Sequence, residues 1–234
     1  MSERATVATH GVGRQLGMLA EALVDSGCRV VEFAPGSEAE IVLVGAGPKV
    51  AFEGRPLVDL TDNEPALEPG VGVCDAALVE HFPEHGRRVL SLLVGGDDSE
   101  FRRVESVCSG AVRAVLHAGT FGAAHKSRAL IHTMYLTLKN AAEEIVAVAR
   151  EHDIGAAEIL GIINKSSGES LASQALYRMA TEPAGGNAGI HGEIEAAMIS
   201  DLRNALDLAS ESGMSGLFAR RVYDRLEIKG RKSL

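Results

Sequence analysis

The segment that decides the fold is residues 119–151, which read GTFGAAHKSRALIHTMYLTLKNAAEEIVAVARE, with neither proline nor glycine from Ala123 to Glu151. Apolar residues recur at intervals of three and four, and this spacing places them on one face of a helix. They are Ile131, Met134, Tyr135, Leu138, Ile145 and Val148. At about 1.5 Å of rise per residue the helix is roughly 40 Å long. A helix of this length is typical of the spine of a helical domain or of a dimer.

The chain before this helix alternates strands with a few helices. Its apolar segments predict seven strands, and their near-continuous apolar character is typical of a buried, largely parallel sheet. The strands are expected at residues 5–9, 29–33, 39–44, 56–60, 72–78, 89–94 and 112–116. The third, fourth and fifth are joined by glycine- and proline-rich connections, which are short for a parallel crossover of a dozen or more residues. Either the central α/β unit is abbreviated, or some strands lie outside the sheet.

The pattern changes close to Gly119, because every later periodic segment has helical spacing. We therefore predict an α/β domain over residues 1–118 and an all-α domain, built on the long helix, over residues 119–234.

The composition argues against several kinds of partner. The 234 residues carry a net charge of -9 and no tryptophan, which argues against nucleic acid and anionic membranes. No apolar run approaches the ~20 residues that span a bilayer, and the first residues do not resemble a signal peptide. The three cysteines and eight histidines show no metal-ligand or disulfide spacing. We expect a cytoplasmic protein that uses no metal and binds a small molecule.

A glycine pair follows the first predicted strand. Gly11 and Gly13, with Glu32 about 20 positions further on, match part of the G-x-G-x-x-G dinucleotide fingerprint. In that motif a helix N-terminus faces a pyrophosphate, and an acidic residue meets the ribose. Leu16 stands in place of the third glycine. The pattern predicts either a nucleotide site at Gly11, Gly13 and Glu32 or a tight strand-to-helix turn.

Lys126 stands in the first turn of the long helix, just after a glycine pair. The positive end of the helix dipole disfavours its ammonium form, which suits a general acid or base near neutral pH. The alternative is a surface lysine at the end of a loop between domains. Thr133 shares its side of the helix, on a mixed face that could line a cleft.

A turn rich in small polar residues, Asn164 to Ser170, lies between two later predicted helices. Ser167 and Gly168 in this turn are candidates for a phosphate or carboxylate site. The simpler interpretation is that Ser170 is the N-cap of the helix that follows.

These segments together resemble the β-hydroxyacid dehydrogenases, a family that includes 3-hydroxyisobutyrate dehydrogenase and is related to 6-phosphogluconate dehydrogenase and the imine reductases. The resemblance rests on residues 94–97, 116–126 with the long helix, 153–155 and 164–170. It implies a Rossmann-type domain that binds NAD(P), a helical domain that forms a homodimer, and a small hydroxyacid, carbonyl or imine substrate. In the family, the lysine that matches Lys126 handles the substrate proton during hydride transfer. We expect the substrate at Gly122, Thr133, Ser167 and Gly168.

The chain departs from the family at several of these positions. Leu16 in place of the third glycine is the first departure. Ala34 and Pro35 stand where the family has its ribose-binding residues. Leu130 stands where the family has an asparagine, one turn after the lysine. The helices between the third, fourth and fifth strands are missing. Three functions stay open: an NAD(P)-dependent oxidoreductase, a cofactor-independent lyase, isomerase or cyclase with Lys126 as base and His81 or His125 nearby, and a non-catalytic dimer that binds a small ligand or a partner protein.

Overall fold

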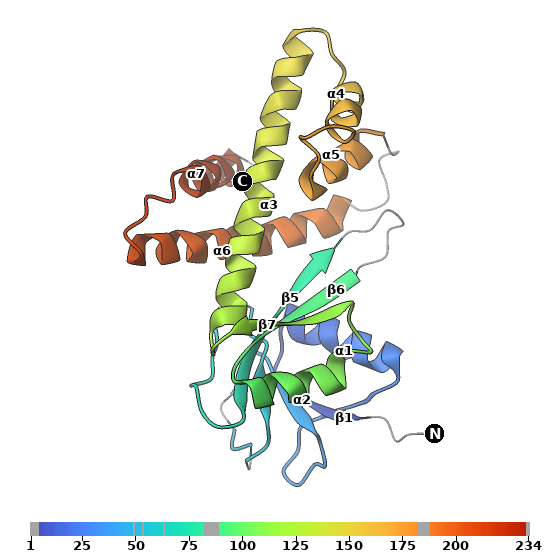
Figure 1. The fold of residues 1–234 in the computed structure, drawn as a ribbon, viewed down its shortest axis with the longest axis vertical. Helices are drawn as coiled ribbons and strands as arrows, with labels where there is room; N and C mark the ends of the chain where they lie inside the picture. The colour runs from blue at the N-terminus through green and yellow to red at the C-terminus, as the bar shows by residue number, and fades with distance from the viewer. Residues whose placement is uncertain are drawn as a thin grey trace. The chain divides into compact units, whose positions relative to one another are not determined.

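Seven strands form one sheet in the order β2-β1-β3-β4-β5-β6-β7 (Figure 1). This computed structural model describes residues 5–48, 50–52, 54–62, 64–81, 89–181 and 188–232. The strands are β1 Thr6–His10, β2 Arg29–Glu32, β3 Ile41–Val44, β4 Leu57–Asp59, β5 Val73–His81, β6 Val89–Gly95 and β7 Ala114–Gly119. All seven predicted strands therefore belong to the sheet.

The strands from β2 to β5 pair in parallel, whereas β5 and β6 pair antiparallel and β7 runs parallel to β6. In the described parts of the connections β3–β4 (residues 45–56) and β4–β5 (residues 60–72), no helix is present. Of the two alternatives from the sequence, an abbreviated α/β unit or strands outside the sheet, the structure has the abbreviated unit.

The two faces of the sheet are covered differently. Helices α1 (Arg14–Ser26) and α2 (Asp98–Cys108) pack on one face, where Leu19 and Leu23 of α1 are fully buried with strand residues such as Ile41. On the other face, Phe52 and Leu67 from the helix-free connections pack against a smaller cluster with Val42. Loops thus cover part of the sheet that crossover helices would cover in a longer domain.

The helical part of the chain is built on α3 (Ala123–Glu151), whose bounds confirm the predicted long helix. It continues through α4 (Ala156–Ile163), α5 (Leu171–Thr181), α6 (Ala188–Glu211) and α7 (Leu217–Lys232) (Figure 1). A hydrogen bond joins α3 to α6, with the half-buried His132 Nδ1 2.6 Å from the buried Asp201 Oδ2. Arg203 of α6 donates to the Tyr223 hydroxyl of α7. The predicted fold class, a Rossmann-like α/β part followed by an all-α part, is confirmed.

The chain divides into two compact units, Met1–Arg128 and Ala129–Leu234, and the division falls within α3. A domain boundary at residues 118 and 119 stays a prediction. No helix of the described residues has the length and apolar character needed to cross a membrane.

Candidate functional site

Lys126 lies in the first turn of α3, and its side chain is exposed. Within the described residues its ammonium makes no hydrogen bond or ion pair. Two neighbours on the helix are buried instead, since His125 is 4% exposed and Arg128 is 5% exposed. The first turn of α3 therefore presents one free cationic group to solvent and buries two polar side chains against the sheet.

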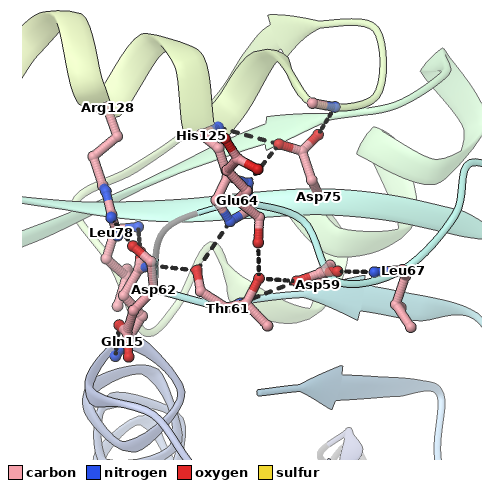
Figure 2. Close-up of polar contacts among 11 residues, drawn as sticks. Gln15, Asp59, Thr61, Asp62, Glu64, Leu67, Asp75, Leu78, His125 and Arg128 are labelled. Atoms are coloured by element: carbon pink, nitrogen blue, oxygen red, sulfur yellow. Dashed lines mark hydrogen bonds and ion pairs between the residues drawn. The ribbon is translucent and has the colours of Figure 1, made fainter. Parts of the chain in front are cut away.

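Asp75 of β5 holds the N-terminus of α3 in place (Figure 2). Its fully buried carboxylate accepts hydrogen bonds from the Gly122 N–H at 2.6 Å and the His125 N–H at 3.1 Å. The His125 ring bridges two groups, with Nδ1 2.8 Å from Asp75 Oδ2 and Nε2 3.0 Å from the Thr61 carbonyl oxygen. Since a carbonyl oxygen only accepts, Nε2 carries a hydrogen. His125 is thus a buried structural residue, and the side chain of His81 lies outside the described residues.

A second buried carboxylate, that of Asp59, ends β4 just before the β4–β5 connection. Asp59 Oδ1 accepts from the Thr61 N–H at 3.0 Å and the Thr61 hydroxyl at 2.7 Å, while Oδ2 accepts from the Leu67 N–H at 2.6 Å (Figure 2). Gln15 of α1 donates to the Thr61 carbonyl at 2.9 Å and accepts from the Leu78 N–H at 2.7 Å. Through Gln15 these bonds tie the connection to α1 and β5, and the bond of His125 to the Thr61 carbonyl ties it to α3.

Asp62, in the same connection, faces the N-terminus of α1. Its carboxylate accepts from the Arg14 N–H at 3.2 Å and lies 3.4 Å from the Gln15 N–H. The Arg128 guanidinium donates to the Asp62 main-chain carbonyl, and the Arg14 guanidinium pairs with Glu80. The helix N-terminus therefore already faces an anion supplied by the chain itself.

Gly11 and Gly13 form the predicted turn between β1 and α1, and Gly11 has a φ of 84°. A Cβ at Gly11 would lie 2.6 Å from the Ala46 carbonyl oxygen, so main chain of the β3–β4 connection already fills the space beside the turn. Glu32 ends β2 with an exposed side chain. The main chain of residues 45–46 thus adjoins the turn, and the Asp62 carboxylate adjoins the N-terminus of α1.

The residues predicted to contact substrate occupy different settings. The Gly122 N–H is bonded to Asp75, and the Thr133 hydroxyl donates to the Ala129 carbonyl of its own helix at 2.8 Å. Ser167 and Gly168 are exposed in the α4–α5 turn. Their role in binding stays a prediction.

Ser170 caps α5, as the simpler interpretation of the α4–α5 turn expected. Its hydroxyl accepts from the Ser173 N–H at 3.1 Å, and its own N–H donates to the Ser173 hydroxyl at 2.9 Å. The Ser173 hydroxyl in turn donates to Asn164 Oδ1 at 2.6 Å. This network fixes the turn without any ligand.

A hollow of about 200 Å³ lies beside α2, lined by residues that include Leu57, Cys74, Glu100 and Arg103. Cys74 belongs to the core on the α1 and α2 face of the sheet, whereas Asp75, the next residue, points to α3. Lys126 is therefore not part of this hollow. Burial raises the pKa of the Cys74 and Cys108 thiols to about 12, which keeps them protonated and unreactive.

No sequence pattern assigned a role to Asp59, Asp62 or Asp75. Asp59 and Asp75 each follow apolar residues of a predicted strand, and the parallel pairing of β4 and β5 places the two aspartates side by side in register. Asp62 carries no comparable signal, because its partners at α1 are 47 and 48 positions away. Among the described residues, no three histidine, cysteine, aspartate or glutamate side chains are grouped so that they could hold a metal ion.

No protein-family model matches the chain, and no curated protein matches its sequence. Solved structures do match it. A 3-hydroxyisobutyrate dehydrogenase from Mycobacterium tuberculosis, solved with L-serine, is 16% identical over 94% of this chain and 92% of that chain, with a TM-score of 0.67. The 3-hydroxyisobutyrate dehydrogenase from Salmonella typhimurium is 12% identical over 97% and 95%, with a TM-score of 0.68.

An imine reductase from Myxococcus stipitatus, a variant in complex with NAD+, is 20% identical over 97% of this chain and 94% of that chain, with a TM-score of 0.53. At these identities the similarity concerns the fold. The resemblance seen in the sequence is therefore confirmed for the fold. The chain has the fold of the β-hydroxyacid dehydrogenases, and its structural neighbours include 3-hydroxyisobutyrate dehydrogenases and imine reductases.

Proposed function

We propose that this chain is an acid/base enzyme in which Lys126 moves a proton on a small hydroxyacid, carbonyl or imine compound, without a dinucleotide in the Gly11–Gly13 turn. The observation that carries the proposal is the contrast within the first turn of α3. The Lys126 ammonium is exposed and unpaired within the described residues, whereas its neighbours His125 and Arg128 are buried and bonded. An exposed lysine side chain that has no protein partner can exchange a proton with a bound substrate.

The main chain of residues 45–46 beside Gly11 and the Asp62 carboxylate at the N-terminus of α1 favour a reaction that needs proton transfer alone. Lyases, isomerases and cyclases that act beside a carbonyl or imine group meet this requirement, because a base removes a proton and returns it elsewhere. His125 does not assist directly, since both of its ring nitrogens lie within hydrogen-bonding distance of protein groups.

A second candidate is an NAD(P)-dependent oxidoreductase, which the similarity in fold to the imine reductase solved with NAD+ supports. Its cofactor would bind at Gly11, Gly13 and Glu32, with Lys126 as the acid or base during hydride transfer. This candidate requires Asp62 and residues 45–46 to leave the turn.

The substrate of either candidate would contact Gly122, Thr133, Ser167 and Gly168. Ser167 supports this part of the proposal most directly, because its exposed hydroxyl makes no hydrogen bond within the described residues.

The chain would act as a homodimer joined through the helical part. The support is an apolar stripe on α3 whose members are exposed in the single chain. The stripe consists of Ile131, Met134, Leu138, Ile145 and Val148. Large apolar side chains in a continuous exposed row are typical of protein interfaces. The thiols of Cys28, Cys74 and Cys108 are free, which supports a reducing compartment such as the cytoplasm.

Proton exchange in deuterated water tests this function. NMR would follow the loss of carbon-bound protons from a panel of small oxo acids, hydroxyacids and cyclic imines, with and without NADH or NADPH. Lys126→Ala is expected to lower the exchange rate about 10²–10⁴-fold. Lys126→Arg keeps the positive charge but cannot exchange a proton near neutral pH, and it should be equally slow.

Each alternative predicts a different result. Turnover only in the presence of NADH or NADPH would favour the oxidoreductase. Exchange at the wild-type rate in both Lys126 variants would exclude Lys126 as the acid or base. No exchange with any compound, together with unchanged ligand binding in both variants, would favour a non-catalytic dimer.

A further inference from the structure

We infer that the two helix-free connections of this chain have filled the groove in which a dinucleotide would lie, with the Asp62 carboxylate in place of a phosphate. The inference goes beyond the role of Lys126 and does not depend on it. It concerns three adjoining places: the N-terminus of α1, the turn before it, and the ends of β1 and β2.

The first place is the N-terminus of α1. Free N–H groups and the helix dipole make such an end a site for an anion. Here the Asp62 carboxylate accepts from the Arg14 N–H at 3.2 Å and lies 3.4 Å from the Gln15 N–H. The carboxylate is part of the chain, so it binds without the loss of translational freedom that a separate ligand suffers. An incoming phosphate would have to displace it against repulsion between two anions.

Three further bonds hold Asp62 at this position. Its main-chain carbonyl accepts from the Arg128 guanidinium, and the neighbouring Thr61 carbonyl accepts from both Gln15 and His125. Asp59 fixes the start of the connection through the Thr61 N–H and hydroxyl. The carboxylate is thus presented to α1 by a segment that is anchored on both sides.

The second place is the glycine turn itself. Val12 and Ala46 exchange two main-chain hydrogen bonds of 2.8 Å, and the Gly45 N–H donates to the His10 carbonyl at 2.8 Å. The N–H of Val12 is therefore used within the protein and does not face a ligand. Main chain fills the space beside Gly11, and a main chain cannot swing aside as the end of a side chain can.

The third place is the end of β1 and β2, where a dinucleotide-binding fold holds adenosine and its ribose. Phe52, from the β3–β4 connection, packs against His10 and Phe33 with ring centroids 5.4 Å and 5.2 Å apart. The His10 Nε2 lies 2.8 Å from the Pro48 carbonyl oxygen, which closes this end further. An aromatic cluster thus occupies the place of the adenosine.

The short connections explain why the groove is filled. A connection without a helix has to satisfy its main-chain polar groups and bury its apolar side chains in another way. The β3–β4 connection does so by pairing with the glycine turn and packing Phe52 on the sheet. The β4–β5 connection does so through Asp59 and Asp62.

The experiment uses thermal unfolding and calorimetry to measure how inorganic pyrophosphate, NADH and NADPH bind to the full chain and to three variants. None of the three is expected to stabilise the wild type at millimolar concentration. Asp62→Asn keeps the size of the side chain and removes its charge, and pyrophosphate should raise its Tm by about 2 °C or more. Asp97→Asn is the matched control, since Asp97 caps α2 in the same unit, and it should gain no such response.

If the wild type binds NADH or NADPH in competition with pyrophosphate, the inference is overturned. This measurement uses the wild type alone, so it remains valid even if Asp62→Asn does not fold. An equal rise in Tm with pyrophosphate in Asp62→Asn and Asp97→Asn would also overturn the inference. The rise would then follow from removing a carboxylate at any helix N-terminus. No gain in a folded Asp62→Asn would show that the carboxylate does not hold the place of a phosphate. Lys126→Ala should leave all of these results unchanged, so failure of the proposed reaction can be told apart from failure of this inference.

Discussion

Asp59, Asp62 and Asp75 are carboxylates whose oxygens meet main-chain N–H groups. Asp59 accepts from Leu67, Asp62 from Arg14, and Asp75 from Gly122. Ionised carboxylates make short, strong bonds with N–H donors, and a buried one is costly without them. Each aspartate therefore ties a loop or the N-terminus of a helix to a neighbouring part of the α/β unit.

His125→Leu is expected to lower the free energy of unfolding by about 1–3 kcal/mol, because buried Asp75 then loses one of its partners. Urea denaturation monitored by circular dichroism would measure the change. His152→Leu, at an exposed position, serves as the control and should stay within about 0.5 kcal/mol of the wild type. Equal stability of the wild type and His125→Leu would mean that the ring bonds contribute nothing.

Among the elements, α3 has a dual character. Its first turn is bonded to the sheet through Asp75, and its later turns belong to the helical unit, where His132 pairs with Asp201. One long helix thus carries Lys126 near one end and an exposed apolar stripe along the rest. The α4–α5 turn, by contrast, is held by a hydroxyl network that needs no ligand.

Ser170→Ala is expected to cost about 1 kcal/mol of unfolding free energy, because the Ser173 N–H at the start of α5 loses its cap. Ser167→Ala, three positions earlier in the same turn, makes the matched comparison. It should leave stability within about 0.5 kcal/mol and, where Ser167 contacts substrate, raise KM alone. A larger loss of stability in Ser167→Ala than in Ser170→Ala would contradict the assignment of the cap.

For the whole molecule, the helix-free connections have two consequences. They shorten the α/β part, and they cover one face of the sheet with Phe52 and Leu67, which pack beside Val42. The same connections reach the glycine turn and α1. The absence of helices in them therefore accounts both for the shorter α/β part and for the inferred filling of the dinucleotide groove. The helical part keeps an uncovered apolar row that a second copy of the chain would bury.

Light scattering on the double variant Met134→Glu, Ile145→Glu tests the homodimer. These side chains are 67% and 50% exposed in the single chain, and a dimer through this row would have to bury two unpaired charges per subunit. The variant should have half the mass of the wild type. Ala147→Glu, exposed on another side of α3, should keep the wild-type mass. A wild type that is monomeric at every concentration would contradict the proposal.

By itself the sequence determined the fold class, the bounds of α3 and the number of strands, because apolar periodicity and the absence of glycine and proline act over neighbouring residues. It also identified Lys126 as the candidate acid or base and singled out Gly11 and Gly13 as a turn. These conclusions depend on local spacing, which a sequence displays directly.

Only the tertiary structure decided which of these features are buried, which are exposed, and which distant residues they bond. Arg14 and Asp62 are 48 positions apart, and Asp75 and His125 are 50 apart, so no local pattern pairs them. Whether a glycine turn binds a phosphate depends on what else reaches the helix end, and here the chain's own carboxylate reaches it. Burial of His125 beside exposed Lys126 likewise follows from the rotation of α3 against the sheet, which long-range packing sets and local spacing does not.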